Sequence, residues 1–202
     1  YTVTGGGNYC PGGAGVHVGV SWSNVGTNYN LYRGTTLVST LPGTDSTVDF
    51  GLQTVAGTYT VVAMNAISSC TSNMTGSAVV VINALPVVYS VTGGGGYCAG
   101  GVGLHVTLSG SQTGVNYQLY RDGSSVGAPV AGTGFTLDLG VHNFAGTYTI
   151  SAVNTTTACT ADMAGSVIIV INPLPALFTL TGGGSYCSGG AGLDIVLAGS
   201  TA

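Results

Sequence analysis

The sequence predicts an all-β protein made of tandem sandwich repeats, and three observations carry this prediction. A glycine-rich segment recurs at a nearly constant period, apolar residues alternate with polar ones in short runs, and clusters of Gly, Asn, Ser and Pro separate these runs. Alternation with a period of two is typical of strands that bury one face. No stretch shows the apolar period of an amphipathic helix.

The repeat is clearest around the cysteines. The segment at residues 5–15 recurs at 93–103 and again at 182–192, so that Cys98 lies 88 residues after Cys10 and Cys187 lies 89 residues after Cys98. A fixed period of this kind predicts structural units that follow one another along the chain. We therefore divide the chain into repeat 1 (1–88), repeat 2 (89–177) and the first strands of an incomplete third repeat (178–202). We expect that third segment to pair either with its own continuation or with another chain.

Within repeat 1, the short apolar runs predict strands at residues 1–4, 15–23, 28–33, 36–41, 46–51, 57–65 and 77–83. In the second run, Val16, Val18, Val20 and Trp22 alternate with small or polar residues, which predicts that these four face inward. About seven short strands per repeat is typical of an immunoglobulin-like β-sandwich. The segment between the repeats is short and contains Pro86, so we expect a stiff rod.

Composition limits the classes of partner. The 202 residues include six acidic and two basic side chains, and 45% are hydrophobic. Two arginines cannot neutralise a row of phosphates, which excludes nucleic-acid binding. The apolar content is high enough for a folded core. No run approaches the roughly 18 apolar residues of a transmembrane helix, so we expect no membrane span.

The cysteines predict disulfides. Cys10 and Cys70 are 60 residues apart, and Cys98 and Cys159 are 61 residues apart. One pair at matching places in each repeat predicts the bonds Cys10–Cys70 and Cys98–Cys159, and leaves the partner of Cys187 outside the chain. Buried free thiols are the alternative. Disulfides indicate an oxidising compartment, which places the protein outside the cell or on its surface.

No group of residues predicts catalysis, a cofactor or a metal. The glycine-rich segments lack the Gly-Lys-Ser/Thr of a phosphate-binding loop. His17 and His105 are equivalent, but Asp194 takes this place in the third repeat, so we expect surface positions. Asp49 and Asp138 supply one carboxylate per repeat, which is too few for calcium. We therefore expect that the chain is not an enzyme.

Four tyrosines recur in two pairs. Tyr59 and Tyr148 fit a tyrosine corner, in which the hydroxyl group bonds to the backbone and has a structural role. Tyr32 and Tyr120 alternate opposite to buried leucines, which predicts surface aromatics that contact sugars or a neighbouring chain. Half-buried sheet aromatics are the alternative for this second pair.

The order of these elements is distinctive. A cysteine with a glycine-rich turn (10–15) is followed by Tyr-Asn-Leu-Tyr (29–32), Gly-Thr-Tyr-Thr-Val (57–61) and a second cysteine, Cys70, and the order recurs from Cys98 to Cys159. In this respect the chain resembles the immunoglobulin-like tandem repeats of large Bacteroidetes cell-surface and secreted proteins of the adhesin, stalk or extracellular filament type. The resemblance implies an extracellular location and O-glycosylation at Ser46, within Asp-Ser-Thr.

These observations favour a structural extracellular protein, either a self-associating filament or a rigid surface stalk, with copies of itself as partners. Low charge removes the repulsion that keeps domains apart, and the predicted strand edges lack the Lys and Glu that block pairing. The alternative is an adhesin that binds glycans or a host protein through exposed strand and loop residues. A third hypothesis is a spacer joined to an enzyme elsewhere in a longer chain.

Overall fold

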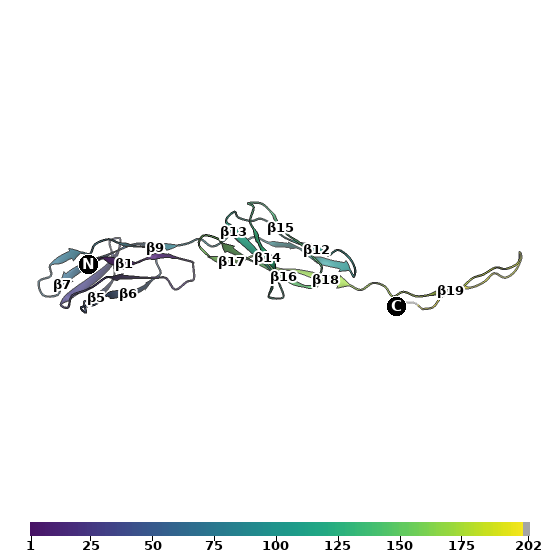
Figure 1. The fold of residues 1–202 in the computed structure, drawn as a ribbon, viewed down its shortest axis with the longest axis horizontal. Coiled ribbons are helices and arrows are strands. Elements are labelled where there is room, and N and C mark those ends of the chain that lie inside the picture. Colours follow the sequence, from purple (N-terminus) through teal and green to yellow (C-terminus); the bar gives the residue numbers. More distant parts are fainter. Residues whose placement is uncertain (200–202) are drawn as a thin grey trace.

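The computed structural model describes residues 1–199 and shows two β-sandwiches in line, followed by a β-hairpin (Figure 1). The strands of the first sandwich are β1 (Val3–Gly5), β2 (Gly7–Tyr9), β3 (Val16–Val20), β4 (Thr27–Arg33), β5 (Thr36–Pro42), β6 (Val48–Gln53), β7 (Gly57–Asn65), β8 (Thr71–Asn73) and β9 (Ala78–Ile82). Those of the second are β10 (Val91–Gly93), β11 (Gly95–Cys98), β12 (Leu104–Leu108), β13 (Val115–Arg121), β14 (Ser124–Ala131), β15 (Leu137–His142), β16 (Gly146–Asn154), β17 (Thr160–Asp162) and β18 (Val167–Asn172). The hairpin consists of β19 (Leu180–Gly182) and β20 (Ile195–Leu197).

Both sandwiches have the same topology. In the first, a three-stranded sheet β1-β3-β6 lies opposite a six-stranded sheet β2-β9-β7-β4-β5, in which β8 also pairs with β7. In the second, the order is β10-β12-β15 and β11-β18-β16-β13-β14, with β17 on β16. The prediction of an all-β fold of immunoglobulin-like sandwiches is confirmed. The predicted strands at 1–4 and 77–83 correspond to β1 and β9, whereas the short strands β2 and β8 lie outside every predicted range.

The glycine run marks the place where the first strand changes sheet. β1 is antiparallel to β3, whereas β2 runs parallel to β9 in the other sheet. Gly5, Gly6 and Gly7, which join them, all have positive φ (89°, 79° and 131°). A Cβ on Gly6 would lie 2.8 Å from the carbonyl oxygen of Val79. Only glycine adopts this backbone without strain and allows this close approach.

Each sandwich has a core of its own. In repeat 1, Val18, Val20, Leu31 and Tyr59 are almost completely buried between the sheets, and a separate cluster of equivalent residues fills repeat 2. Trp22 does not belong to the core: its side chain is 45% exposed, because β3 ends at Val20. The expectation that Trp22 faces inward was wrong.

The tyrosine corners are confirmed. The buried Tyr59 hydroxyl group donates a hydrogen bond to the Val55 carbonyl (2.8 Å), and Tyr148 donates to that of Phe144 (2.9 Å). Each bond ties the start of β7 or β16 to the loop before it. The role of these tyrosines is therefore structural.

The terminal hairpin repeats the start of a sandwich. β19 and β20 pair antiparallel with Leu180 opposite Leu197, which is the register of Val3 opposite Val20 in repeat 1. Leu197 is 50% exposed, whereas Val20 is 1% exposed. The hairpin thus has the pairing of a repeat and an uncovered apolar face, because no second sheet lies against it within residues 1–199.

Candidate functional site

The two sandwiches are joined by a disulfide that neither contains alone. Cys10, in the turn after β2, is bonded to Cys159, in the loop before β17, with a Cα–Cα distance of 5.5 Å. Cys70, Cys98 and Cys187 are exposed and unbonded. The predicted pairs Cys10–Cys70 and Cys98–Cys159 are therefore wrong. The bond connects repeat 1 to repeat 2 across 149 residues of chain.

The geometry of one sandwich explains why it cannot close the predicted bond. Tyr9, next to Cys10, pairs with Ile82, which lies beyond the Gly57 end of β7. Cys70 lies at the other end of this strand, where its carbonyl accepts a hydrogen bond from the backbone N–H of Asn65 (2.9 Å). Nine residues of strand separate the two ends by about 25–30 Å. A disulfide needs Cα atoms within about 7 Å, so the two cysteines of one repeat cannot meet.

The same separation holds in repeat 2. Cys98 pairs with Asn172, beyond the Gly146 end of β16, whereas the Cys159 carbonyl accepts a hydrogen bond from Asn154 at the opposite end. A turn at one end of each sandwich and a loop at the other therefore carry the two cysteines. When sandwiches stand end to end, the turn of one meets the loop of the next.

The polypeptide provides a second connection at this junction. A linker of residues 83–90 connects β9 to β10, and the backbone N–H of Val87 donates a hydrogen bond to Gln112 Oε1 of repeat 2 (2.6 Å). At its start, the Asn83 N–H donates to the Tyr9 carbonyl (2.9 Å), beside the disulfide turn. Repeat 1 and repeat 2 are thus held by the linker, by this hydrogen bond and by the Cys10–Cys159 bond.

The loop that carries Cys159 is shaped by its own hydrogen bonds. Asn154 Oδ1 accepts from the backbone N–H groups of Thr156 (2.9 Å) and Thr157 (3.0 Å). Ala158 has the positive φ of 57° that turns the chain back toward β17. An asparagine that bonds to the following backbone groups is a common way to fix such a turn. The cysteine is held in place and fully buried at the junction.

A polar pair recurs on the three-stranded sheet of each sandwich. His17 Nδ1 lies 2.7 Å from Asp49 Oδ2, and His105 Nδ1 lies 2.7 Å from Asp138 Oδ2. These side chains are more than half exposed, as expected for surface positions. The sequence analysis predicted surface positions for the His and the Asp but did not predict that they pair. Both residues recur in the two repeats, and this shared recurrence could have indicated the pair.

The His–Asp pairs lack the third member of a catalytic triad. Among residues 1–199, no hydroxyl group is hydrogen-bonded to either imidazole. That part of the chain also contains no group of three or more His, Cys, Asp or Glu side chains that could hold a metal ion. Exposed pairs of this kind contribute roughly 0–1 kcal/mol to stability.

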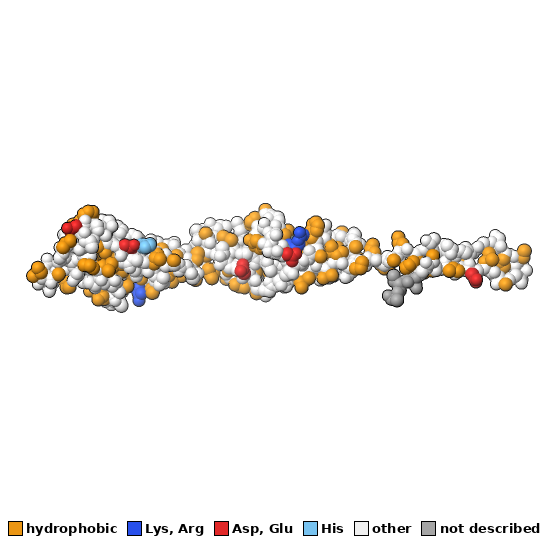
Figure 2. All heavy atoms as spheres, turned by 90° about the horizontal axis from the view of Figure 1, so that it is seen from below, with side chains coloured by type: hydrophobic (Ala, Val, Ile, Leu, Met, Phe, Trp, Pro, Cys, Tyr) orange, Lys and Arg blue, Asp and Glu red, His pale blue; other side chains and the backbone are white. Residues whose placement is uncertain are grey.

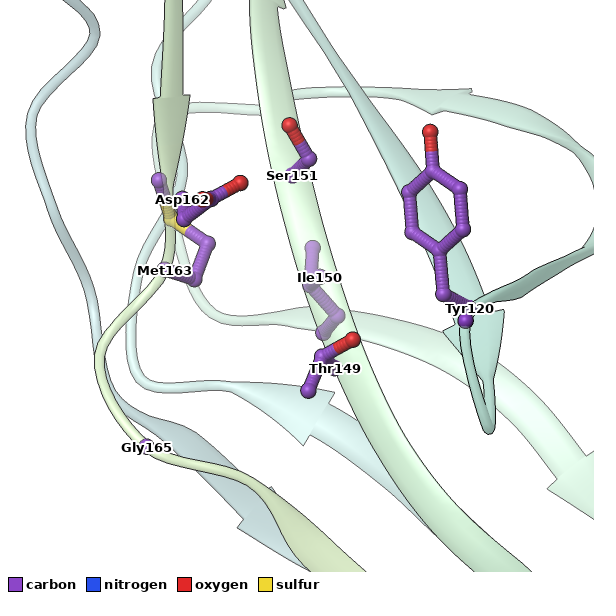
Figure 3. A pocket seen from close by; sticks show the side chains of 8 residues that line it. Tyr120, Thr149, Ile150, Ser151, Asp162, Met163 and Gly165 are labelled. Atoms are coloured by element: carbon purple, nitrogen blue, oxygen red, sulfur yellow. The ribbon is translucent and has the colours of Figure 1, made fainter.

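The predicted surface tyrosines are half-buried. Tyr120, on β13, lines a hollow of about 360 Å³ (Figure 3). In that view Tyr120 stands on one side of β16, and Asp162 and Met163 stand on the other. The rest of the lining consists of Gly123, Thr149, Ile150, Ser151 and Gly165. Tyr32 is half-buried at the equivalent place in repeat 1.

Ser46 lies in the exposed loop before β6. Its hydroxyl group is 2.7 Å from that of Thr44, and its carbonyl accepts a hydrogen bond from Ser23. The neighbouring Asp45 has a positive φ of 54°. The loop is accessible to a modifying enzyme, and glycosylation at Ser46 stays a prediction.

No helix long and apolar enough to span a bilayer occurs in residues 1–199. The sequence matches no known protein-family profile and no curated protein.

Several solved structures are similar to this chain. Fibronectin(III)-like modules of Clostridium thermocellum CbhA are 15% identical, with 85% of this chain and 95% of that chain covered and a TM-score of 0.42. Murine CEACAM1b is 14% identical, with 84% and 100% covered and a TM-score of 0.39. The Bacteroides ovatus mixed-linkage glucan utilization locus protein SGBP-B, in complex with a mixed-linkage heptasaccharide, is 13% identical, with 86% and 45% covered and a TM-score of 0.24. At these identities the likeness concerns the fold alone.

Proposed function

We propose that the protein is an extracellular structural element, a stiff rod of immunoglobulin-like repeats that associates with copies of itself as a filament or serves as a surface stalk, and that it is not an enzyme. The observation that carries this proposal is the Cys10–Cys159 bond between successive sandwiches. A disulfide also supports an oxidising, extracellular location.

The argument for stiffness is geometric. Two domains joined by one linker swing and twist about it, and relative motion is the usual behaviour of such pairs. A second covalent connection at another point of the junction removes most of these rotations. Here the linker leaves from Ile82 at the end of β9, while the disulfide leaves from the turn after β2.

Small-angle X-ray scattering of the purified chain tests the rod. We expect the maximum dimension of the oxidised protein to change little between samples. In the Cys10→Ser variant we expect a shorter average maximum dimension, because the repeats then bend at the linker. Cys70→Ser is the matched control when both variants are measured as purified monomers, since Cys70 is exposed and unbonded within the single chain. If Cys10→Ser scatters like the unchanged protein, the disulfide does not set the stiffness.

Self-association is supported by an apolar stripe on the outer face of β9 and β18. Its members recur in the two repeats and are all exposed: Val79 and Val81, and Ile168 and Val170. Charged side chains are few on the face shown in Figure 2, so that little charge opposes contact between rods. Exposed apolar residues that recur along a rod favour side-by-side packing of copies.

A pair of matched substitutions tests this packing. Val170 on β18 and Val141 on β15 are 47% and 46% exposed in the two different sheets of repeat 2. In sedimentation velocity at rising protein concentration, we expect Val170→Asp to remain monomeric and Val141→Asp to associate like the unchanged chain. Equal association of both variants would remove the stripe from the proposal, and a monomeric unchanged chain would remove the filament.

An adhesin is the second candidate, and the hollow beside Tyr120 favours it. Aromatic side chains next to carboxylate and hydroxyl groups are suited to sugar rings, and Tyr120, Asp162 and Ser151 supply these groups. Binding to a glycan array that is lost in Tyr120→Ala and kept in Tyr120→Phe would support this function. If no glycan on the array binds, the structural function is the proposal that remains.

A further inference from the structure

The five cysteines form two classes with different places in the repeat. Turn cysteines (Cys10, Cys98 and Cys187) follow the glycine-rich crossing of the first strand, and loop cysteines (Cys70 and Cys159) precede the last strand. The bond at the junction joins one member of each class, the turn cysteine of repeat 1 and the loop cysteine of repeat 2.

The turn has the same form whether or not its cysteine is bonded. The Cys10 carbonyl accepts a hydrogen bond from Gly13 (3.0 Å), and the carbonyl of the unbonded Cys98 accepts one from Gly101 (3.0 Å). The Cys187 carbonyl accepts one from Gly190 (2.9 Å). Cys98 is therefore presented at the far end of repeat 2 as Cys10 is at the far end of repeat 1.

The loop also has the same form in both states. Asn65 donates to the Cys70 carbonyl over 2.9 Å, as Asn154 does to that of Cys159. The preceding residues, Ser69 and Ala158, share a φ of 57°. Asn65 Oδ1 accepts from two backbone N–H groups, at 3.0 and 2.9 Å, just as Asn154 Oδ1 does.

The two loops differ in the burial of their cysteines. Cys159 is fully buried at the junction, whereas Cys70, in the same loop, is exposed at the free end of repeat 1. A repeat of this kind placed before repeat 1 would cover Cys70 as repeat 1 covers Cys159.

We propose that Cys70 and Cys98 are crosslinking sites for further repeats of this same kind: Cys70 bonds to the turn cysteine of a preceding repeat, and Cys98 to the loop cysteine of a following one. Each repeat is then bonded to both neighbours and contains no disulfide of its own. This proposal extends the proposed rod to further repeats, and its biological role rests on that rod. The pairing of a turn cysteine with a loop cysteine rests instead on the cysteine geometry. The neighbouring repeat belongs either to the same polypeptide or to a second copy of this chain.

The bond needs an oxidant of the disulfide class, such as glutathione disulfide. One thiol loses its proton, and its thiolate attacks the oxidant to give a mixed disulfide and one released thiol. The second cysteine, as thiolate, then attacks the mixed disulfide at the protein sulfur and displaces the other half of the oxidant. Two protein thiols are oxidised to one disulfide, and the oxidant is reduced to two thiols.

The first experiment is a disulfide map of the protein isolated without reduction, with free thiols blocked. We expect Cys70 and Cys98 each in a disulfide with a cysteine of the opposite class. Recovery of either as a blocked thiol, or a bond between two cysteines of the same class, would overturn the proposal.

The second experiment identifies the source of the neighbouring repeat. In a Cys187→Ser background, Cys70→Ser leaves one unpaired thiol at Cys98, and Cys98→Ser leaves one at Cys70. The two variants are oxidised with glutathione disulfide, alone and as an equal mixture, and run on a non-reducing gel. A band of doubled mass in the mixture only assigns the bond to a second copy. With an opposite-class map, no such band in any sample assigns it to the same polypeptide.

A band that forms as readily from one variant alone would show that the bond does not select its class, and would overturn the proposal. The scattering test of stiffness concerns Cys10 and Cys159, which neither variant changes. Failure of the crosslinking rule and failure of the rod are therefore distinguishable.

Discussion

Repeat 1 and repeat 2 have the same strands, the same sheet order and the same loop before the last strand, but the cysteine of that loop is exposed in one and buried in the other. The difference does not come from the repeat itself. It comes from what stands before it: repeat 2 follows another sandwich, and Cys159 is bonded to that neighbour. Each sandwich is thus held together by its own core, and the cysteines serve the boundary between sandwiches.

The largest effect is expected from the core, and it sharpens this comparison. Ile150 on β16 is 2% exposed in the cluster of repeat 2, so Ile150→Ala should lower the stability of that repeat by about 2–5 kcal/mol. Because the two clusters are separate, we expect scanning calorimetry to show one transition at a lower temperature and one unchanged. Val153→Ala, on the same strand and 36% exposed, is the control. A common shift of both transitions would mean that the repeats do not fold as separate units.

The next effect concerns the strand crossing that both repeats share. Gly6 and Gly12 have nearly equal φ (79° and 80°), but a Cβ would meet the Val79 backbone only at Gly6. Either change to Ala costs about 1–2 kcal/mol for the left-handed backbone. Gly6→Ala should cost more in urea unfolding, because the strand must also move away from β9. Equal losses would show that the close approach does not matter.

Much of the fold was predictable because the long strands carry a clear signal. The predicted strand at 57–65 coincides with β7, where alternation extends over nine residues and Tyr59 forms the tyrosine corner. β2 and β8 have three residues each, which is too short for alternation to be recognised. Trp22 continues the alternating pattern although β3 ends at Val20. The alternation alone does not show where a strand ends, and for this reason Trp22 was wrongly predicted to face inward.

The disulfide was mispredicted because equal spacing says which cysteines correspond, not which ones meet. The equivalents of Cys10 and Cys70 occur together in both complete repeats, and this favoured a bond between them. A turn after the first strand and a loop before the last lie at opposite ends of the observed sandwich. Combining the predicted fold with the chain direction of its strands would have separated the two cysteines and pointed to the neighbouring repeat.

The smallest effect compares the two cysteine loops directly. Asn65→Ala and Asn154→Ala each remove the acceptor of two backbone hydrogen bonds, and we expect each to lower the stability of its own repeat by about 1–2 kcal/mol. Only Asn154→Ala should also make the Cys10–Cys159 bond react faster with a thiol reductant, because only its loop holds a bonded cysteine. Equal reduction rates in the two variants would indicate that the loop does not protect the bond.

The disulfide pairing is the central claim, and the sequence itself provides its most direct test. Arg33 and Arg121 are the only basic residues, so trypsin divides the unfolded chain into residues 1–33, 34–121 and 122–202. The monomeric oxidised protein is treated with a thiol-blocking reagent, digested without reduction and weighed by mass spectrometry. A bond between Cys10 and Cys159 predicts one species that joins 1–33 to 122–202 and does not include the fragment 34–121. A single species that joins all three fragments, as the pairs Cys10–Cys70 and Cys98–Cys159 require, would contradict the account.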